Sequence, residues 1–396
     1  MDYRHNYIKV IVHVMLALRQ DEGLSINTGR SHFEFASELA QFASEITLQD
    51  VNVVTIEHGV VEEVNSFSPI ENEKSLHEPL RHVLLRIDDT EEHDWQPEAS
   101  ADEIIESMAL LQQTGNLAPP QLDRHMAPWA MIAVPGPLWA SKILGKNCEE
   151  SKLWELFAPV YKLDQNNPVQ AWKEHISLVN HRLVTLNRLE IDHIRITTKD
   201  TELTLACVDQ SRWRGGLMHL GTGRTFIPML PLDRVTMLPD RFRTDGVLTA
   251  TRPFRLLARE IIGAKFLFSS GMVVDYDAVK GKDILDLVFS KEDNARRLGE
   301  LSLIDEYYSL GSLCDRFDTL SLDTHLSSSV LFGMGEAIHL EALETYEDAK
   351  QMEQSTGCNL SDIRFRVPFG NKDMTVRAIL SDGSEFVIIN EGHIWS

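Results

Sequence analysis

The chain has 396 residues, of which 43% are hydrophobic, 25% charged and 8% aromatic. This length predicts two or three domains at about 100–200 residues each, and the composition excludes a small disulfide scaffold and a wholly disordered chain. The 60 acidic residues outnumber the 38 basic ones and give a net charge of −22, which disfavours nucleic acid and membrane surfaces as partners.

The cysteines and the first apolar run bear on the cellular compartment. The four cysteines lie far apart and form no CxxC pair, so they indicate neither a disulfide framework nor a thiolate zinc site. The apolar run from Ile8 to Leu18 is interrupted by Lys9 and His13, and no small-residue cleavage site follows it. It is also shorter than the roughly 20 apolar residues of a membrane span. We therefore expect a cytoplasmic protein.

The first 60 residues predict an α/β unit. Helical periodicity through Leu18 precedes a short apolar strand at Leu24–Asn27. Apolar residues then recur at helical spacing over 33–43, and Asp50–Glu57 is a β-branched strand pattern. A helix between two such strands is typical of a crossover connection.

The pattern up to residue 190 predicts further elements of both kinds. We expect a strand at Val83–Ile87, a helix at Ile104–Leu111 and a buried strand at Trp129–Pro135. A longer helix is predicted at Val169–Leu189, because a proline precedes a regular helical repeat. From residue 191 the pattern changes to short strands, so we predict domains of residues 1–190 and 191–396.

The second domain is predicted to be mixed α+β. Its short strands are followed by a helix predicted at Ser328–Leu343. The chain ends in two predicted strands, Thr375–Leu380 and Glu385–Ile389. The tripeptide Ser381–Asp382–Gly383 between them is typical of a hairpin turn.

Common catalytic motifs do not identify a reaction class in this sequence. The sequence contains no HExxH, GxSxG or P-loop motif, and its fragment Gly221–Thr222–Gly223 lacks the third glycine of a nucleotide-binding loop. The 15 histidines are scattered, and His175 and His181 lie on one helix that we expect to face solvent. These observations assign no reaction class.

Several longer runs establish a resemblance. WAMIAVPGPLWASKIL (129–144), KLWELF (152–157) and NNPVQAWKEHISLVNHRLVTLN (166–187) follow one another at fixed spacing. With NARRLGE (294–300) and DGSEFVIINEGHIW (382–395), they resemble the metal-dependent aminopeptidase family that contains aminopeptidase T and aminopeptidase S. The resemblance covers most of the chain. It implies a two-domain α/β architecture of the aminopeptidase T type and a homodimer.

The same resemblance implies an active site in the second domain. Enzymes of that family hold two divalent cations through two glutamates, two histidines and an aspartate, which activate water and polarise a peptide carbonyl. Glu300 matches the second glutamate and is our candidate catalytic residue. Gly246 takes the place of the first glutamate, with Asp245 one residue away. The first histidine falls near Ser329, and His325 is a displaced candidate.

The last two ligands of the family pattern are replaced by arginines. A histidine and an aspartate two residues apart on a strand are expected there, and this chain has Arg364–Phe365–Arg366. Residues two apart on a strand face the same side. Guanidinium groups have no lone pair to donate and stay protonated. One such charge about 4 Å from a dication is repelled by several kcal/mol even at an effective dielectric of about 20.

These arginines lead to two expectations. We predict that the protein uses no metal cofactor, and that Arg364 and Arg366 bind a carboxylate of a small-molecule or short-peptide substrate. Asp245 and His325 are assigned to the same substrate site. An alternative is that Glu300 forms a buried ion pair with the arginines and only fills the former metal site.

Three functions are consistent with the sequence. One is a repurposed enzyme that acts on amide or peptide-like substrates without two-metal hydrolysis, for example by forming amide bonds in small-molecule biosynthesis. Another is an active aminopeptidase with unusual ligands and a divalent metal such as zinc or cobalt. A non-catalytic binding protein is the third. We favour the first, because two ligands replaced by two arginines form a directed change.

Overall fold

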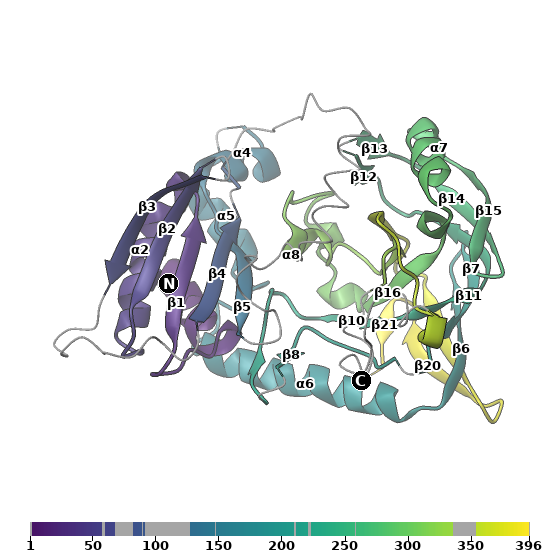
Figure 1. The fold of residues 1–396 in the computed structure, drawn as a ribbon, viewed down its shortest axis with the longest axis horizontal. Helices are drawn as coiled ribbons and strands as arrows, with labels where there is room; N and C mark the ends of the chain where they lie inside the picture. Colours follow the sequence, from purple (N-terminus) through teal and green to yellow (C-terminus); the bar gives the residue numbers. More distant parts are fainter. Residues whose placement is uncertain are drawn as a thin grey trace.

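The chain folds as a mixed α/β protein, as the sequence predicts (Figure 1). The computed structural model describes residues 2–57, 60–67, 82–88, 90–91, 127–146, 148–209, 211–220, 223–257, 259–335 and 354–395. The helix predicted at Ile104–Leu111 lies outside these residues, as do Gly221 and Thr222. Within the described ranges, no helix has the length and apolar character needed to cross a membrane.

A five-stranded sheet in the order β3-β2-β1-β4-β5 forms the first half of the chain. Three neighbouring pairs, β1 with β2, β1 with β4 and β4 with β5, are parallel, whereas β3 is antiparallel to β2 at one edge. The predicted crossover helix is α2 (Phe33–Ser44), which buries Phe35, Leu39 and Ala43. The strands are β1 (Gly23–Thr28), β2 (Val51–Glu57), β3 (Val60–Phe67), β4 (His82–Asp88) and β5 (Trp129–Ala133).

Other helices of this half pack aromatic side chains together. The ring of Tyr7 stacks on that of Tyr161 with centroids 4.9 Å apart, and Phe157 packs beside both Tyr161 and Trp139. Tyr7 lies on α1 (Tyr3–Val10), Trp139 on α4 (Pro137–Leu144) and Phe157 on α5 (Glu150–Phe157), and Tyr161 follows α5. The helix α1 continues as a π-helical turn over Ile11–Met15.

The long helix α6 (Pro168–Arg188) runs from the first half of the chain toward the second (Figure 1). Its start agrees with the predicted signal, because Pro168 lies in the first turn and the Asn167 side chain accepts a hydrogen bond from the Gln170 amide at 3.1 Å. Its buried residues include Trp172, His175 and Arg182. Polar side chains therefore enter the interior from this helix.

An eight-stranded antiparallel sheet in the order β15-β14-β11-β7-β6-β19-β20-β21 forms much of the second half. The predicted terminal hairpin is present as β19 and β20. The helix α7 (Lys282–Lys291) packs Ile284, Val288 and Phe289 into the same core. The strands are β6 (Ile191–Thr197), β7 (Glu202–Cys207), β11 (Pro239–Thr249), β14 (Lys265–Ser269), β15 (Met272–Asp277), β19 (Thr375–Leu380), β20 (Glu385–Asn390) and β21 (His393–Ile394).

A four-stranded antiparallel sheet, β10-β16-β17-β18, lies against this core. Its strands are β10 (Arg234–Met237), β16 (Leu298–Ile304), β17 (Ser329–Gly333) and β18 (Arg364–Pro368). The helix predicted at Ser328–Leu343 is therefore wrong in its first part, where the chain forms β17. A short apolar run that is buried between two neighbouring strands has no alternation that separates strand from helix.

Short elements complete the described chain. The helix α8 (Leu320–Asp323) lies between the two halves in Figure 1. Two small hairpins are β8 (Met218–His219) with β9 (Thr225–Phe226) and β12 (Phe254–Leu256) with β13 (Arg259–Ile261). Single 3₁₀ turns cover Arg30–His32, Asp293–Arg296, Glu306–Tyr308 and Leu310–Ser312.

The first core also takes residues from beyond position 190. Leu230, Leu310 and Phe317 are buried in the same cluster as Tyr7. The Trp139 indole donates a hydrogen bond to the Phe317 carbonyl at 2.8 Å. The segments around 227–232 and 310–322 thus join the two halves, and the division of the chain at residue 190 stays a prediction.

Candidate functional site

The four-stranded sheet has one apolar and one polar face. Strand residues alternate between faces, and residues paired across antiparallel strands share a face. The apolar face packs into the second core with Val235, Met237, Leu301, Leu303, Val330, Phe332, Phe365 and Val367. By the same register, the opposite face, called here the polar face, carries Arg234, Thr236, Glu300, Ser302, Ser329, Leu331, Arg364 and Arg366.

A buried ion pair lies at the centre of the polar face. Oε1 of Glu300, a residue only 3% exposed, lies 2.8 Å from a guanidinium nitrogen of Arg366. Arg366 also donates a hydrogen bond to Ser329 Oγ at 3.0 Å. A second guanidinium, that of Arg234, approaches the same carboxylate oxygen to 3.5 Å. The ion pair that the sequence suggested as one alternative is therefore present, and two cations share one carboxylate.

His325 is buried in the same electrostatic environment. It follows α8, and its Nδ1 lies 2.9 Å from the Ser321 carbonyl, so Nδ1 carries the hydrogen and donates. Desolvation by burial, with a further contribution from the positive charge of Arg234, lowers the pKa of His325 to about 4. The charge of Arg366 lowers this pKa as well, whereas the charge of Asp233 and the hydrogen bond to Ser321 raise it, and the imidazole is neutral at pH 7.

The other two predicted site residues, Arg364 and Asp245, lie on different sheets. Arg364 lies on the same face as Arg366, as their spacing on β18 requires, and is opposite Gly333 on β17. Asp245 lies on β11 of the eight-stranded sheet and is exposed. Its carboxylate accepts a hydrogen bond from the Ser270 amide at 2.8 Å, at the turn between β14 and β15. The described contacts thus join Arg366 to Glu300, whereas those of the His325 side chain are to Ser321 and Thr324 and Asp245 belongs to another sheet.

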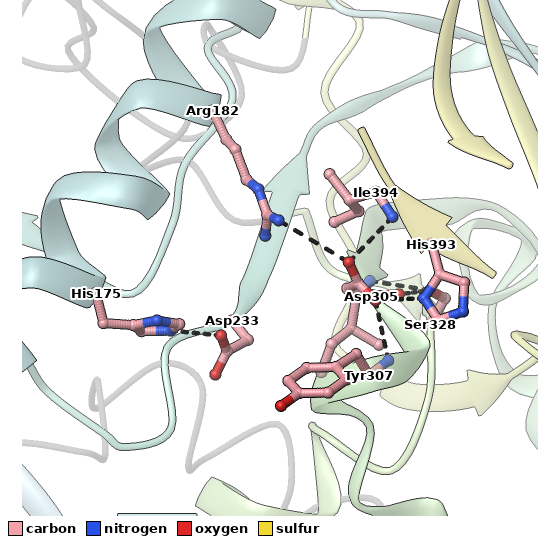
Figure 2. A network of polar contacts seen from close by, with 9 residues as sticks. His175, Arg182, Asp233, Asp305, Tyr307, Ser328, His393 and Ile394 are labelled. Carbon is pink, nitrogen blue, oxygen red and sulfur yellow. Dashed lines mark hydrogen bonds and ion pairs between the residues drawn. The ribbon is translucent and has the colours of Figure 1, made fainter. Parts of the chain in front are cut away.

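A second buried polar network, which the sequence did not reveal, adjoins this site (Figure 2). His175 on α6 points toward Asp233, whose carboxylate lies 2.5 Å from its Nε2. Asp233 directly precedes Arg234. The expectation that the helix of His175 presents it to solvent is wrong, because this side chain is buried against Asp233 and the ring of Tyr308.

Asp305 forms the other centre of this network, one residue beyond β16. Its carboxylate accepts hydrogen bonds from the amides of Tyr307 and Ile394 at 2.9 and 3.1 Å and contacts Nδ1 of His393 at 3.0 Å. Arg182 points toward it from α6 at 3.9 Å (Figure 2). The strand that carries Glu300 is in this way attached to α6 and to the C-terminal strand β21.

Cys207 and Cys314 are not activated nucleophiles. Burial raises the pKa of Cys207 to about 12 and that of Cys314 to about 11, so both thiols stay protonated at neutral pH. All four cysteines are free, and Cys358 is fully buried. Acid–base and ion-pairing groups of the polar face remain the better candidates for chemistry.

We tested whether the residues of the polar face suit a divalent metal. Metal sites of this kind need anionic oxygens and neutral imidazoles gathered around one point. Among the residues that the structure describes, no group of three or more His, Cys, Asp or Glu side chains is arranged to hold an ion. Glu300 instead faces the guanidinium groups of Arg366 and Arg234. The described residues around Glu300 do not fit a dication.

Comparison with known proteins gives several relatives. Aminopeptidase T of Thermus aquaticus is 28% identical over 269 residues, which cover 67% of this chain and 64% of that protein. Aminopeptidase 2 of Geobacillus stearothermophilus is 27% identical over 276 residues, with the same two shares. The match therefore spans just under two thirds of the length of these curated relatives.

Similarity to a solved structure extends over the whole fold. Wild-type AmpT from Thermus thermophilus superposes with a TM-score of 0.78 at 20% sequence identity and covers 100% of this chain and 99% of that one. At this identity the comparison concerns the fold, and it confirms the aminopeptidase T-like architecture implied by the sequence runs.

A family model described as thermophilic metalloprotease (M29) matches residues 3–394. Our prediction that the protein uses no cofactor is therefore wrong, because the family and the aminopeptidase T relatives imply a divalent metal. That prediction relied on the repulsion between arginines and a dication. The two arginines contact Oε1 of Glu300, and this local repulsion does not determine which cofactor the protein uses. By the match over nearly its entire length, the chain belongs to the thermophilic metalloprotease family M29.

Proposed function

We propose that this protein is an enzyme that acts on the amide bonds of short peptides or amino-acid derivatives. Membership of a metalloprotease family and similarity to proteins named aminopeptidase support this reaction class. The polar face of the four-stranded sheet also supports it, because a charged group, the carboxylate of Glu300, is kept there only 3% exposed at a desolvation cost.

The observation that carries the proposal is the excess of positive charge around Glu300. Two guanidinium groups, from Arg366 and Arg234, contact one carboxylate, and Arg364 lies on the same face. A guanidinium group binds carboxylates through forked hydrogen bonds. In this proposal Arg366 and Arg364 bind a substrate carboxylate, while Glu300 holds Arg366 in place.

Calorimetric titration tests the carboxylate site. We expect N-acetyl-L-alanine to bind at least about tenfold more tightly than N-acetyl-L-alaninamide, which lacks the carboxylate. The variant Arg364→Ala should reduce this preference. Arg377→Ala is the matched control, because the Arg377 side chain on β19 is 40% exposed and pairs with Glu385 at 3.3 Å. Equal affinity for the two probes would contradict the proposal.

The direction of the reaction is a separate question. Hydrolysis is tested with short peptides in the presence and absence of zinc or cobalt, the metals that the resemblance implies. The suggestion that amide-bond formation has replaced hydrolysis stays a prediction, and adding an activated acyl donor with an amino acid tests it. Release of free amino acids from peptides, with no condensed product, would contradict that suggestion.

We also propose that the protein is a cytoplasmic homodimer. The dimer follows from the resemblance to the aminopeptidase family, and the cytoplasm follows from the four widely spaced cysteines, which form no CxxC pair. Light scattering should give twice the mass of one chain, and the mass of a monomer would contradict the proposed dimer. Fractionation of the source cells tests the proposed cytoplasmic location.

A further inference from the structure

Helix α6 directs two buried polar side chains toward the second half of the chain (Figure 2). His175 and Arg182 are seven residues apart, which is about two helical turns and places them on one face of the helix. The carboxylate of Asp233 accepts a hydrogen bond from Nε2 of His175. Arg182 lies 3.9 Å from the carboxylate of Asp305, and each of the four side chains is at most 9% exposed. The helix is therefore attached to two buried carboxylates.

Both carboxylates lie at the same end of strands β10 and β16. These strands are antiparallel, with Arg234 of β10 opposite Ile304 of β16. Asp233 directly precedes Arg234. Asp305 directly follows Ile304, so the register, extended by one position, brings both acids to this end of the strand pair. The attachment of α6 therefore fixes the start of β10, an outer strand of the four-stranded sheet.

The start of β10 matters for the proposed carboxylate site because Arg234 is the first residue of this strand. The Arg234 guanidinium lies 3.5 Å from Oε1 of Glu300, the oxygen that Arg366 also contacts. The side chains of Arg234 and Arg366 are 21% and 19% exposed, so both guanidinium groups reach the surface, whereas Glu300 is buried. With Arg234 in this position, two cations share the charge of Glu300, and Arg366 retains positive charge for a ligand.

From these contacts we infer that His175 and Asp233 form a positioning pair, through which α6 holds the Arg234 guanidinium beside Glu300 and sets the affinity of the site for a carboxylate. Neither residue of the pair contacts the ligand, and both act through Arg234. The inference rests on the carboxylate site of the proposed function. It gives a contact between the two halves of the chain a role in substrate specificity.

Two substitutions of His175 test the pair. Leucine provides no donor, whereas the side-chain nitrogen of a glutamine can donate to Asp233 from about the position of the imidazole Nε2. The readout is the ratio of the affinities for N-acetyl-L-alanine and N-acetyl-L-alaninamide, measured by calorimetric titration. We expect His175→Leu to reduce this ratio about fivefold or more and His175→Gln to retain most of it.

The matched control is His181→Leu, because His181 is exposed on the same helix. This variant should keep the affinity ratio of the wild type. If His175→Leu lowers the midpoint of urea denaturation but also keeps the wild-type ratio, the role of His175 is structural only and the inference is overturned.

A second background shows whether His175 acts through Arg234. We expect the affinity ratio of Arg234→Met to be the same with and without His175→Leu, because the positioning pair then has no guanidinium to hold. The midpoint of urea denaturation should still fall on adding His175→Leu. A further reduction of the ratio in the Arg234→Met background would overturn the role assigned to Arg234.

Wild-type protein provides a readout that does not depend on folding of the variants. Coupling between two contacts is reciprocal, so a carboxylate that binds better when His175 holds Asp233 must also stabilise that hydrogen bond. At equal saturation, we expect the Nε2 proton of His175 to exchange with solvent more slowly in the complex with N-acetyl-L-alanine than in that with N-acetyl-L-alaninamide.

The outcomes separate this inference from the proposed function. Wild-type protein that binds the two probes with equal affinity would overturn the proposed carboxylate site. A wild-type preference for N-acetyl-L-alanine, together with equal exchange of the His175 proton in the two complexes, would overturn the positioning role alone.

Discussion

The carboxylate of Glu300 lies 2.8 Å from the guanidinium of Arg366, although β17 separates the strands that carry the two residues. Both residues pair with Leu331 of β17, so their side chains leave the sheet on the same face and meet across it. The position that resembles a metal ligand is thereby connected to a positive charge, and our proposal of a carboxylate site on the polar face starts from this pair.

Removing Arg366 should destabilise the fold strongly. The variant Arg366→Ala leaves the buried carboxylate of Glu300 with less compensation, and we expect a loss of about 3 kcal/mol in the free energy of unfolding. Urea denaturation measures this loss. The double variant Glu300→Leu with Arg366→Met should recover most of it, because apolar residues of similar volume can replace a buried ion pair. A change no larger than that of the exposed control Arg377→Ala would contradict a buried pair.

The neutral state of His325 predicts a pH dependence of stability. The folded pKa is about 4 and the unfolded value 6.5, so between these pH values the unfolded chain binds more protons and acid destabilises the fold. Compared with His325→Gln, which does not titrate, wild type should lose about 3 kcal/mol of unfolding free energy from pH 7 to pH 4. Denaturation series for both proteins at several pH values measure the difference. A constant difference would mean that the imidazole is not desolvated.

Asp88 should show the opposite sign. It lies at the end of β4, and burial raises its pKa from 3.8 to about 6. Between these values the folded state binds more protons, so wild type should lose about 3 kcal/mol relative to Asp88→Asn as the pH rises from 3.5 to 7. The same denaturation series tests this. If the free energy of unfolding of Asp88→Asn did not rise relative to that of wild type between pH 3.5 and pH 7, the carboxyl group of Asp88 would be solvated and the prediction wrong.

Asp305 should control the attachment of β21. Its carboxylate accepts from the amides of Tyr307 and Ile394 and contacts His393, so Asp305→Ala leaves buried donors without an acceptor. We expect a loss on the order of 3 kcal/mol and faster hydrogen exchange at the Ile394 amide. Asp382→Ala, at the exposed terminal hairpin, is the control. Unchanged exchange at Ile394 would contradict the role of Asp305.

Much of the architecture could be predicted from the sequence because the signals are local. The strand β1, the helix α2 and the hairpin of β19 and β20 have a clear period or turn residues within a few positions. The placement of Arg364 and Arg366 on one face also follows from spacing alone. In contrast, the residues of β17 from Val330 to Phe332 are all apolar, so the sequence shows no strand-like alternation there. The segment is identified as a strand by its pairing with β16 and β18.

The rest of the site depends on contacts between distant parts of the chain. His175 and Asp233 are 58 positions apart, and Arg366 and Glu300 are 66 apart, so nothing local identifies the partners. The role of Arg234 was not predicted, because it is one of many arginines whose distance to Glu300 depends on the pairing of β10 with β16. Asp245 was assigned by its place in a family pattern, whereas its strand belongs to another sheet.

A crystal structure with N-acetyl-L-alanine tests the central claim most directly, namely that the polar face of the four-stranded sheet receives the substrate carboxylate. We expect the ligand carboxylate about 3 Å from the guanidinium of Arg366 or Arg364, with Glu300 still paired to Arg366. A carboxylate bound elsewhere in the molecule, with both guanidinium groups unchanged, would contradict the account.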